Sequence, residues 1–307
     1  MSLFYTDMFG EHSKIDTAIA RLKNFEEFAL SMSDEGYYVC DSGGKDSSVI
    51  KQLCIEAGVK FAVYHHHTSV DHPETVYFIR REKKRFEDMG IKYEVDYSYD
   101  KDGNRITMWN LIAKKGFPTR IRRFCCEVLK EGGGDHRVIV TGVRWSESSK
   151  RKSRGIYETI TDNKKEKKVL MSDNDDTRKI TESCYKKQKF AINPIVDWEE
   201  EDVWEYIRLK NIPYNPLYDM GYKRVGCVGC PMNVRIKQEL DENPKYKQAY
   251  KHAFDKYLET HPCISAKGPC ANTDDWYNWW VTGKSATGGT QNVTMFDEES
   301  EEENDKD

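Results

Sequence analysis

The sequence lacks the long apolar segments of membrane proteins, since no stretch approaches the ~18 consecutive apolar residues that a spanning helix needs. Its N-terminus has no apolar core of the kind that secretory signal peptides carry. A strong excess of one charge is also missing, because the formal net charge is only -4 over 307 residues. These absences predict a cytoplasmic protein with no membrane partner, and the overall charge does not indicate a nucleic-acid binder.

No internal repeat is visible, and a chain of 307 residues corresponds to one large domain or two modest ones. Shifts in composition suggest where its parts begin and end. The predicted parts are an N-terminal helix over 1–34, an α/β domain over 35–198 with a charged insert at 150–190, a helical, cysteine-containing region over 199–290, and an acidic, disordered tail over 291–307.

Apolar stretches of strand length alternate with helical patterns in the first half of the chain. Strands are predicted at 36–41, 60–66, 92–98 and 137–143, and the helices between them at 46–57, 73–88 and 105–115. Such alternation is typical of an α/β fold with a parallel sheet and helices on both faces. In these folds the ligand crevice lies beyond the carboxyl ends of the strands.

The most informative stretch lies where the first of these strands ends and its helix begins. It is Ser42-Gly43-Gly44-Lys45-Asp46-Ser47-Ser48. The glycines allow a tight turn and close approach of a ligand, while the free N–H groups of the helix start, the hydroxyls and the lysine favour an anion. The residues predict a phosphate site, although the G-x-x-x-x-G-K-[ST] spacing of a Walker A loop is absent. The alternative is a glycine turn capped by serine.

Other polar residues are expected at the same edge of the sheet. Gly142, Arg144 and Glu147 follow a predicted strand, and an arginine there can hold a phosphate or sulfate in bidentate fashion while the glutamate orients it. Asp71 and Glu74 begin the helix after the second strand, where capping explains them about as well as ligand contact does. Asp46 is either a carboxylate favoured by the helix dipole or a Mg²⁺ ligand.

Nine cysteines in a chain predicted to be cytoplasmic favour metal or redox chemistry over disulfides. Cys227 and Cys230 form a C-x-x-C turn flanked by glycines, Cys125 and Cys126 form a second pair, and Cys184 is a fifth candidate. Four thiolates suffice for a 4Fe–4S cluster, and which four of the five would serve stays open. A zinc site, a redox pair or ordinary packing thiols are the alternatives.

Taken together, these motifs resemble the phosphoadenosine phosphosulfate (PAPS) reductase family over about residues 13–285, and in particular its phage- and mobile-element-borne branch. The chain is also similar to the ATP pyrophosphatases of DNA phosphorothioation. The motifs are SGGKDSS at 42–48, DHPET at 71–75, RFCCEVLK at 123–130, GVRWSES at 142–148, PIVDW at 194–198 and GCVGCP at 226–231.

The resemblance implies a Rossmann-like adenine-nucleotide α-hydrolase (HUP) fold in which residues 42–48 bind the phosphates of the nucleotide. It also implies that the cysteine pairs hold an iron–sulfur cluster. Two features differ from the sulfonucleotide reductases of this family: their C-terminal Glu-Cys-Gly-[Leu/Ile]-His motif does not occur here, and their loop lacks the lysine that stands here at 45.

The retained loop predicts an enzyme that cleaves ATP, with Mg²⁺, to AMP and pyrophosphate and so activates an acceptor for sulfur transfer. Lys45, Asp46 and Arg144 are the predicted catalytic residues. The expected partners are an adenine nucleotide, a nucleic-acid acceptor, and a cysteine desulfurase or another sulfur donor. A PAPS or adenylyl-sulfate reductase and a non-catalytic nucleotide or redox sensor are the alternative interpretations.

Overall fold

The computed structural model describes residues 2–8, 10–160, 169–171, 189–261 and 272–283. Cys184 and the predicted tail at 291–307 lie outside the described residues. The chain divides into two compact units. The first comprises Met1–His66, Pro73–Asp96 and Gly133–Val225, and the second His67–His72, Tyr97–Gly132 and Gly226–Asp307. Both units therefore combine distant segments, whereas the sequence suggested consecutive domains over 35–198 and 199–290.

The first unit contains a seven-stranded sheet with the strand order β5-β4-β3-β6-β9-β7-β8. Five neighbouring strands are parallel, while β7 runs antiparallel to both β8 and β9. The strands are β3 (Tyr37–Cys40), β4 (Phe61–His66), β5 (Tyr93–Asp96), β6 (Val138–Val140), β7 (Tyr157–Ile160), β8 (Val169–Leu170) and β9 (Lys189–Ile192). The predicted α/β architecture with a mostly parallel sheet is confirmed.

The strand order has a switch point beside β3, the first strand of the sheet in the chain. From β3 the chain moves outward through β4 to β5 and then returns to β6, which pairs with the other side of β3. Segments that follow β3 and β6 therefore leave the same edge of the sheet in neighbouring positions. In parallel sheets this is where ligands bind.

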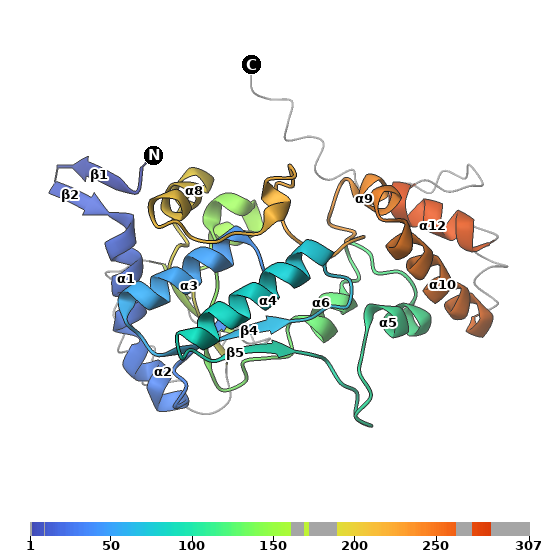
Figure 1. Cartoon of the computed structure of the whole chain (residues 1–307), viewed down its shortest axis with the longest axis horizontal. Coiled ribbons are helices and arrows are strands. Elements are labelled where there is room, and N and C mark those ends of the chain that lie inside the picture. Colours follow the sequence, from blue (N-terminus) through green and yellow to red (C-terminus); the bar gives the residue numbers. More distant parts are fainter. Residues whose placement is uncertain (1, 9, 161–168, 172–188, 262–271, 284–307) are drawn as a thin grey trace, which may run out of the picture. The chain divides into compact units, whose positions relative to one another are not determined.

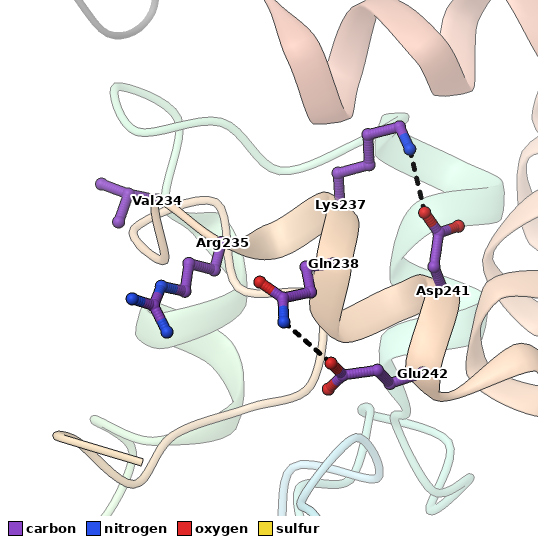
Figure 2. A pocket seen from close by; sticks show the side chains of 6 residues that line it. All are labelled: Val234, Arg235, Lys237, Gln238, Asp241 and Glu242. Atoms are coloured by element: carbon purple, nitrogen blue, oxygen red, sulfur yellow. Dashed lines mark hydrogen bonds and ion pairs between the residues drawn. The ribbon is translucent and has the colours of Figure 1, made fainter. Parts of the chain in front are cut away.

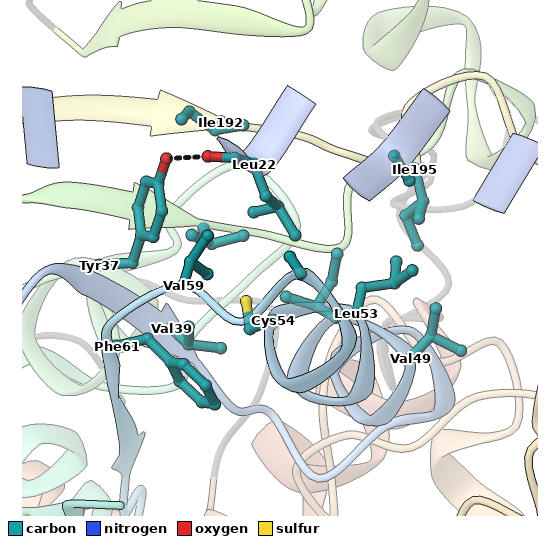
Figure 3. Packing of buried hydrophobic residues seen from close by; sticks show 14 of the residues in the cluster. Leu22, Tyr37, Val39, Val49, Leu53, Cys54, Val59, Phe61, Ile192 and Ile195 are labelled. Carbon is teal, nitrogen blue, oxygen red and sulfur yellow. Dashed lines mark hydrogen bonds between the residues drawn. The ribbon is translucent and has the colours of Figure 1, made fainter. Parts of the chain in front are cut away.

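One face of the sheet carries the main hydrophobic core. Alternate residues of β3, Tyr37 and Val39, pack there with Val49 and Leu53, as Figure 3 shows for part of the cluster. The helices of the unit are α1 (Lys14–Asn24), α2 (Glu26–Met32), α3 (Lys45–Ala57), α4 (Pro73–Asp88) and α8 (Glu200–Leu209). Helix α3 packs against both α1 and α8 (Figure 1).

Two parts of the first unit differ from the sequence-based expectation. The helix expected within 1–34 is preceded by a hairpin of β1 (Phe4–Asp7) and β2 (Gly10–Ser13), and it is interrupted at Phe25. The buried Phe25 ring stacks on Tyr157 with a centroid separation of 4.7 Å, so tertiary packing accompanies the break. The insert at 150–190 was expected to be an irregular loop, yet its described part supplies β7 and β8 to the sheet.

The second unit is helical. Its helices are α5 (Met108–Lys115), α6 (Phe124–Leu129), α9 (Ile236–Glu242), α10 (Pro244–Thr260) and α12 (Thr273–Thr282). Helix α10 packs against α5, α9 and α12 (Figure 1). Aromatic rings dominate the core, where Phe117 stacks on Phe254 and on Trp280 with centroid separations of 4.3 and 4.4 Å. Among the described residues of the whole chain, none of the helices has both the length and the apolar character that a membrane crossing requires.

Replacing Leu53 by Ala tests the position of α3 in the core. The Leu53 side chain is fully buried, so the cavity left behind should lower the free energy of unfolding by about 2–5 kcal/mol. Leu209→Ala is the matched control, since Leu209 is 52% exposed and its truncation should change stability by at most about 0.5 kcal/mol. Urea unfolding followed by circular dichroism measures both. Equal losses in the two variants would contradict the assignment of α3 to the core.

Candidate functional site

Residues 42–48, the glycine loop, connect the end of β3 to the start of α3. Gly43 has a φ of +72°, a conformation that favours glycine. A Cβ added there would also lie 2.8 Å from Thr75 Cγ2. Gly44 is the N-cap residue of α3, so the free N–H groups of the first helical turn open at the loop. The local geometry is therefore the strand, turn and helix start that the sequence predicted.

The buried side chain of Asp41, which the sequence did not single out, stabilises the loop through hydrogen bonds. Its Oδ1 accepts a hydrogen bond from the Gly43 N–H at 2.8 Å and one from the Ser47 hydroxyl at 2.9 Å. The position directly after a buried strand was the available signal, because a charged residue there must find partners at the sheet edge.

Lys51 is the counter-charge of Asp41 and is completely buried on α3. Its Nζ pairs with Asp41 Oδ2 and, at 2.8 Å, with Glu82 Oε2 on α4, while the Tyr93 hydroxyl donates to Asp41 Oδ2 at 2.7 Å. The rings of Phe78, Phe86 and Tyr93 lie 5.4–5.8 Å from the ammonium group. Burial alone would raise the pKa of Asp41, but the charge and hydrogen bond of Lys51 outweigh it and lower the pKa to about 2.

Four charged side chains form a second network, the charge quartet of Lys45, Asp46, Arg144 and Glu200. Lys45 Nζ lies 3.2 Å from Glu200 Oε1 and 3.5 Å from Asp46 Oδ2. Arg144 donates from Nε to Asp46 at 2.7 Å and from Nη2 to Glu200 at 2.8 Å. Both cations are buried, and the structure thus brings together the three predicted catalytic residues. Glu200, the first residue of α8, is a member that sequence reasoning missed.

Gly142 explains how the segment after β6 comes so close to the loop. A Cβ added at Gly142 would lie 2.9 Å from Asp46 Cβ, so only glycine permits this approach. The carboxylate of Glu147 accepts a hydrogen bond from the backbone N–H of Arg144 at 3.1 Å and pairs with Arg151. Glu147 therefore shapes the turn that carries Arg144, while Asp46, Ser146 and Glu200 bind the guanidinium itself.

Two further residues that sequence reasoning missed come from the segment after α8. Asn215 donates to the Gly43 carbonyl oxygen at 3.1 Å and to Thr75 Oγ1 at 3.0 Å. The Tyr218 hydroxyl accepts the backbone N–H of Lys45 at 3.0 Å, and burial raises the pKa of this tyrosine to about 12. The segment Asn-Pro-Leu-Tyr at 215–218 carried no recognisable motif, so the sequence offered no signal for this contact.

The remaining predicted binding residues do not all lie in the glycine loop. Ser42 lies in the loop with its hydroxyl 3.4 Å from Ser47 Oγ, while the Ser48 hydroxyl is buried without a hydrogen-bond partner among the described residues. Glu74 is in the first turn of α4, where its neighbour Thr75 contacts the loop. Asp71 belongs to the second unit and accepts two hydrogen bonds from Thr68, each 2.8 Å long.

The second unit holds a cysteine cavity, a space of about 30 Å³ lined by Cys125, Cys126, Cys227 and Cys230. A volume of this size accommodates about one or two water molecules. The C-x-x-C turn contains Gly229 at a φ of +73°, where a Cβ would lie 2.7 Å from the Tyr250 ring. The fold thus joins two cysteine pairs that are about a hundred residues apart in the sequence. Cys184, the fifth candidate, lies outside the described residues.

Two cations lie beside these thiols. Arg123 Nη2 donates to Cys126 Sγ at 3.2 Å, and the hydrogen bond from the Cys125 thiol together with Arg123 lowers the pKa of Cys126 to about 5. The same interaction with Cys126 raises the pKa of Cys125, and burial raises that of Cys227. Cys227, when ionised to the thiolate, raises the pKa of Lys130. The surroundings therefore favour at least one thiolate.

The donor set of the cysteine cavity fits a thiolate-bound metal centre, since no carboxylate is among the described residues that line it. Within the described ranges, however, no three His, Cys, Asp or Glu side chains converge in the way a metal ion requires. A single zinc ion needs its thiolates within about 2.3 Å of one point, whereas a cluster spreads them over several iron atoms. The thiolate donors match both groups.

A second hollow lies on the surface of α9 and is formed by Val234, Arg235, Lys237, Gln238, Asp241 and Glu242 (Figure 2). Lys237 pairs with Asp241 and Gln238 with Glu242, each across one helical turn. The polar groups of this hollow thus bind one another along one helix, and it contains no cysteine or glycine-loop residue.

Comparison with known sequences identifies the family. A family model described as "Phosphoadenosine phosphosulfate reductase domain" matches residues 37–233, which is more than half of the chain. The chain belongs to the phosphoadenosine phosphosulfate reductase family. The glycine loop, the segment around Arg144 and both cysteine pairs fall within the matched region.

The individual relatives share only about a quarter of their aligned residues with this chain. An uncharacterized protein of Methanocaldococcus jannaschii is 27% identical over 254 residues, covering 78% of this chain and 53% of that protein. The chain spans about half the length of the first two curated relatives it matches. An adenosine 5'-phosphosulfate reductase of Bacillus cereus is 23% identical, covering 74% of this chain and 84% of the relative. The solved PAPS reductase of Candida auris has a TM-score of 0.42, 17% identity, and coverage of 74% of this chain and 98% of that chain.

Replacing Lys51 by Met should strip Asp41 of its buried counter-charge. Removing one member of a buried pair costs about 3–5 kcal/mol, so the free energy of unfolding at pH 7 should fall by this amount. Lys60→Met is the matched control, because Lys60 is exposed in the same unit and its loss should have little effect. Chemical denaturation measures both variants. Similar stabilities of Lys51→Met and wild type would show that the pair is not formed.

The pH dependence follows from the same contact. The pKa of Asp41 is lowered from 3.8 to about 2, so its contribution to stability is complete above pH 4 and is lost as the pH falls towards 2. In Lys51→Met, burial without the counter-charge raises the pKa of Asp41. The variant therefore lacks the contribution of Asp41 to stability over the whole pH range. The stability difference between wild type and variant should therefore narrow between about pH 4 and pH 2. A constant difference over this range would contradict the assignment.

Proposed function

We propose that the protein is an ATP pyrophosphatase that forms AMP and pyrophosphate and activates an acceptor for sulfur transfer in nucleic-acid modification. The observation that carries the proposal is the complete glycine loop, with Lys45 buried at the start of α3 beside Arg144. A family member that releases no pyrophosphate would have no need of a lysine that stabilises this leaving group.

The proposed reaction uses the charge quartet as a site for the triphosphate. Phosphate oxygens replace the Asp46 and Glu200 carboxylates as partners of Lys45 and Arg144. The two carboxylates, released from these cations, would be the oxygen ligands for Mg²⁺, and the bound ion would neutralise phosphate charge. In this scheme Asp46 exchanges Lys45 and Arg144 for Mg²⁺ when ATP binds. The sequence-based interpretations of Asp46, a carboxylate favoured by the helix dipole and a Mg²⁺ ligand, then describe the states before and after ATP binding.

An oxygen of the acceptor attacks the α-phosphorus, the bond to the bridging oxygen of the β-phosphate breaks, and pyrophosphate leaves with the electron pair. Lys45 and the N-terminal N–H groups of α3 stabilise the charge that develops on this leaving group. Asp41, through Gly43 and Ser47, keeps the loop in the required shape before ATP arrives. A sulfur nucleophile then attacks the acceptor atom that bears the adenylated oxygen, and this oxygen leaves with AMP.

We propose that Cys125, Cys126, Cys227 and Cys230 hold a 4Fe–4S cluster once their cavity, which now has room for about one or two water molecules, has widened, with zinc as the alternative and Cys184 as a further candidate. Held by all four cysteines, the cluster would be a structural link, whereas held by three of them it would leave one iron atom able to accept a sulfur ligand. Arg123 and Lys130 provide the positive charge that stabilises thiolates there.

A reductase that forms sulfite from PAPS or adenosine 5'-phosphosulfate is the second candidate. It is favoured by the relatives named adenosine 5'-phosphosulfate reductase, one of which is covered over 84% of its length. This reaction needs a thiol that attacks sulfur and a thiol reductant that regenerates it. The two candidates differ in their nucleotide, since only the pyrophosphatase consumes ATP.

Product analysis with Mg²⁺ and ATP tests the proposal on anaerobically purified protein, with and without DNA or tRNA. Pyrophosphate and AMP should appear, and Lys45→Ala should slow their formation by about 10²–10³-fold, as loss of one charge-stabilising donor does. Lys60→Ala, a change at an exposed lysine of the same unit, should have no effect. Sulfite from PAPS or adenosine 5'-phosphosulfate with ATP untouched would favour the reductase. ATP binding without turnover would favour a nucleotide sensor.

Iron, zinc and acid-labile sulfide analysis of the same preparation tests the cluster. Iron and sulfide should be present in equal amounts, and Cys227→Ser or Cys230→Ser should lower both. Cys54→Ala is the control, because Cys54 is buried in α3 of the first unit, away from the cysteine cavity in sequence and unit. Zinc without sulfide would replace the cluster by a zinc site, and the absence of both would refute a metal centre.

A further inference from the structure

The second unit contains a basic loop, residues 114–123, of which the proposed function uses only Arg123. From 114 to 126 the sequence has five cations, Lys114, Lys115, Arg120, Arg122 and Arg123, and no acidic residue. This local excess is notable in a chain whose formal net charge is -4. A concentration of one charge in a few exposed residues indicates an interaction with the opposite charge.

Both ends of the basic loop are anchored in the core of the unit. Phe117 and Phe124 are buried, and the Pro118 carbonyl oxygen accepts the indole N–H of Trp280 at 2.8 Å. Thr119 and Arg122 close the turn between them through two hydrogen bonds of 3.0 and 3.2 Å, Arg122 N–H to Thr119 Oγ1 and Thr119 N–H to the Arg122 carbonyl oxygen. The tip is therefore presented in one conformation, which reduces the entropy cost of binding.

Side chains at the tip face solvent. Ile121 is 82% exposed, and Arg122 and Arg123 are exposed as well. An apolar side chain this exposed between arginines stabilises nothing in the folded chain by itself. Next to phosphates it can contact a sugar or a base while the arginines bind the backbone.

The basic loop also contacts both cysteine segments. Arg120 Nε donates to the Pro231 carbonyl oxygen at 3.2 Å, directly after the C-x-x-C turn, and Arg123 donates to Cys126. A polyanion that binds the tip therefore lies beside the residues that line the cysteine cavity.

The basic run at 150–154 is another group of cations that could contact a phosphate backbone, but its arginines are paired within the chain. Arg151 pairs with Glu147 and Arg154 with Glu158, so both arginines already have carboxylate partners. No carboxylate pairs with Arg122 in the part of the chain that the structure describes. Charge complementarity thus favours the basic loop over this run.

We infer that the basic loop binds the phosphate backbone of the polynucleotide acceptor and holds it beside the cysteine cavity. The inference rests on the proposed function, because it supplies the surface that a nucleic-acid substrate would need. Several separated cations match the repeating charge of a polynucleotide better than they match a mononucleotide, whose phosphates would be bound by one or two of them. Single-stranded DNA, duplex DNA and tRNA share this backbone.

Fluorescence anisotropy with labelled single-stranded DNA, duplex DNA and tRNA at several salt concentrations tests the inference on the full chain. Binding should weaken with salt, and Arg122→Ala should weaken it further and reduce the slope of log affinity against log salt by about 1. Adding Lys114→Ala should reduce the slope by about 1 more. Lys245→Ala, a change at an exposed lysine of α10 in the same unit, is the matched control and should leave affinity and slope unchanged.

The outcomes separate this inference from the proposed function. Pyrophosphate release without polymer should be equal in Arg122→Ala and wild type, whereas its stimulation by the tightest-binding polymer should be lost in the variant. Polynucleotide binding that is unaffected in both loop variants, or absent in the wild type at low salt, would overturn the role of the basic loop even if ATP is cleaved. Loss of unstimulated turnover in Arg122→Ala would also overturn it, since the residue would then act at the reaction itself.

Discussion

The buried pair of Asp41 and Lys51 is the interaction on which the glycine loop depends. A fully buried ammonium group is tolerated only because two carboxylates and three aromatic rings surround it. Its partner Asp41 holds the Gly43 N–H and the Ser47 hydroxyl, and Glu82 extends the network to α4. The loop is thereby given its shape by charges beneath it.

The charge quartet is a second network in which carboxylates hold cations, and it includes Lys45 and Asp46 of the glycine loop. Lys45 and Arg144 are held by Asp46 and Glu200 without a ligand, so the cations are oriented in advance and little reorganisation is needed when phosphate takes the place of the carboxylates. Within the phosphoadenosine phosphosulfate reductase family, this retained lysine is the feature that distinguishes an ATP-cleaving interpretation from a reductase. In the proposed function, the cysteine cavity of the second unit is the site of sulfur chemistry. The basic loop of the same unit binds the acceptor.

Much of this could be anticipated from local patterns. The α/β class, the parallel strands, the turn at Gly43 and the start of α3 all follow from short stretches in which propensity and spacing agree. The roles of Glu200, Asn215 and Tyr218 could not, because each acts on the loop from more than 150 residues away and none lies in a recognisable motif. The interruption of the first helix at Phe25 likewise depends on the Tyr157 ring that packs against it.

The sequence by itself determined the strand, the glycine turn and the helix N-terminus with its lysine, from which an anion site is predicted, and it placed cysteines in pairs from which a metal centre is predicted. These are consequences of local geometry and side-chain chemistry, which adjacent residues specify. Only the tertiary structure decided that Cys125–Cys126 and Cys227–Cys230 line one cavity, that Asp71 belongs with them, and that Lys51 neutralises Asp41. Such pairings join residues far apart in the chain, and burial and charge compensation select them only when the chain has folded.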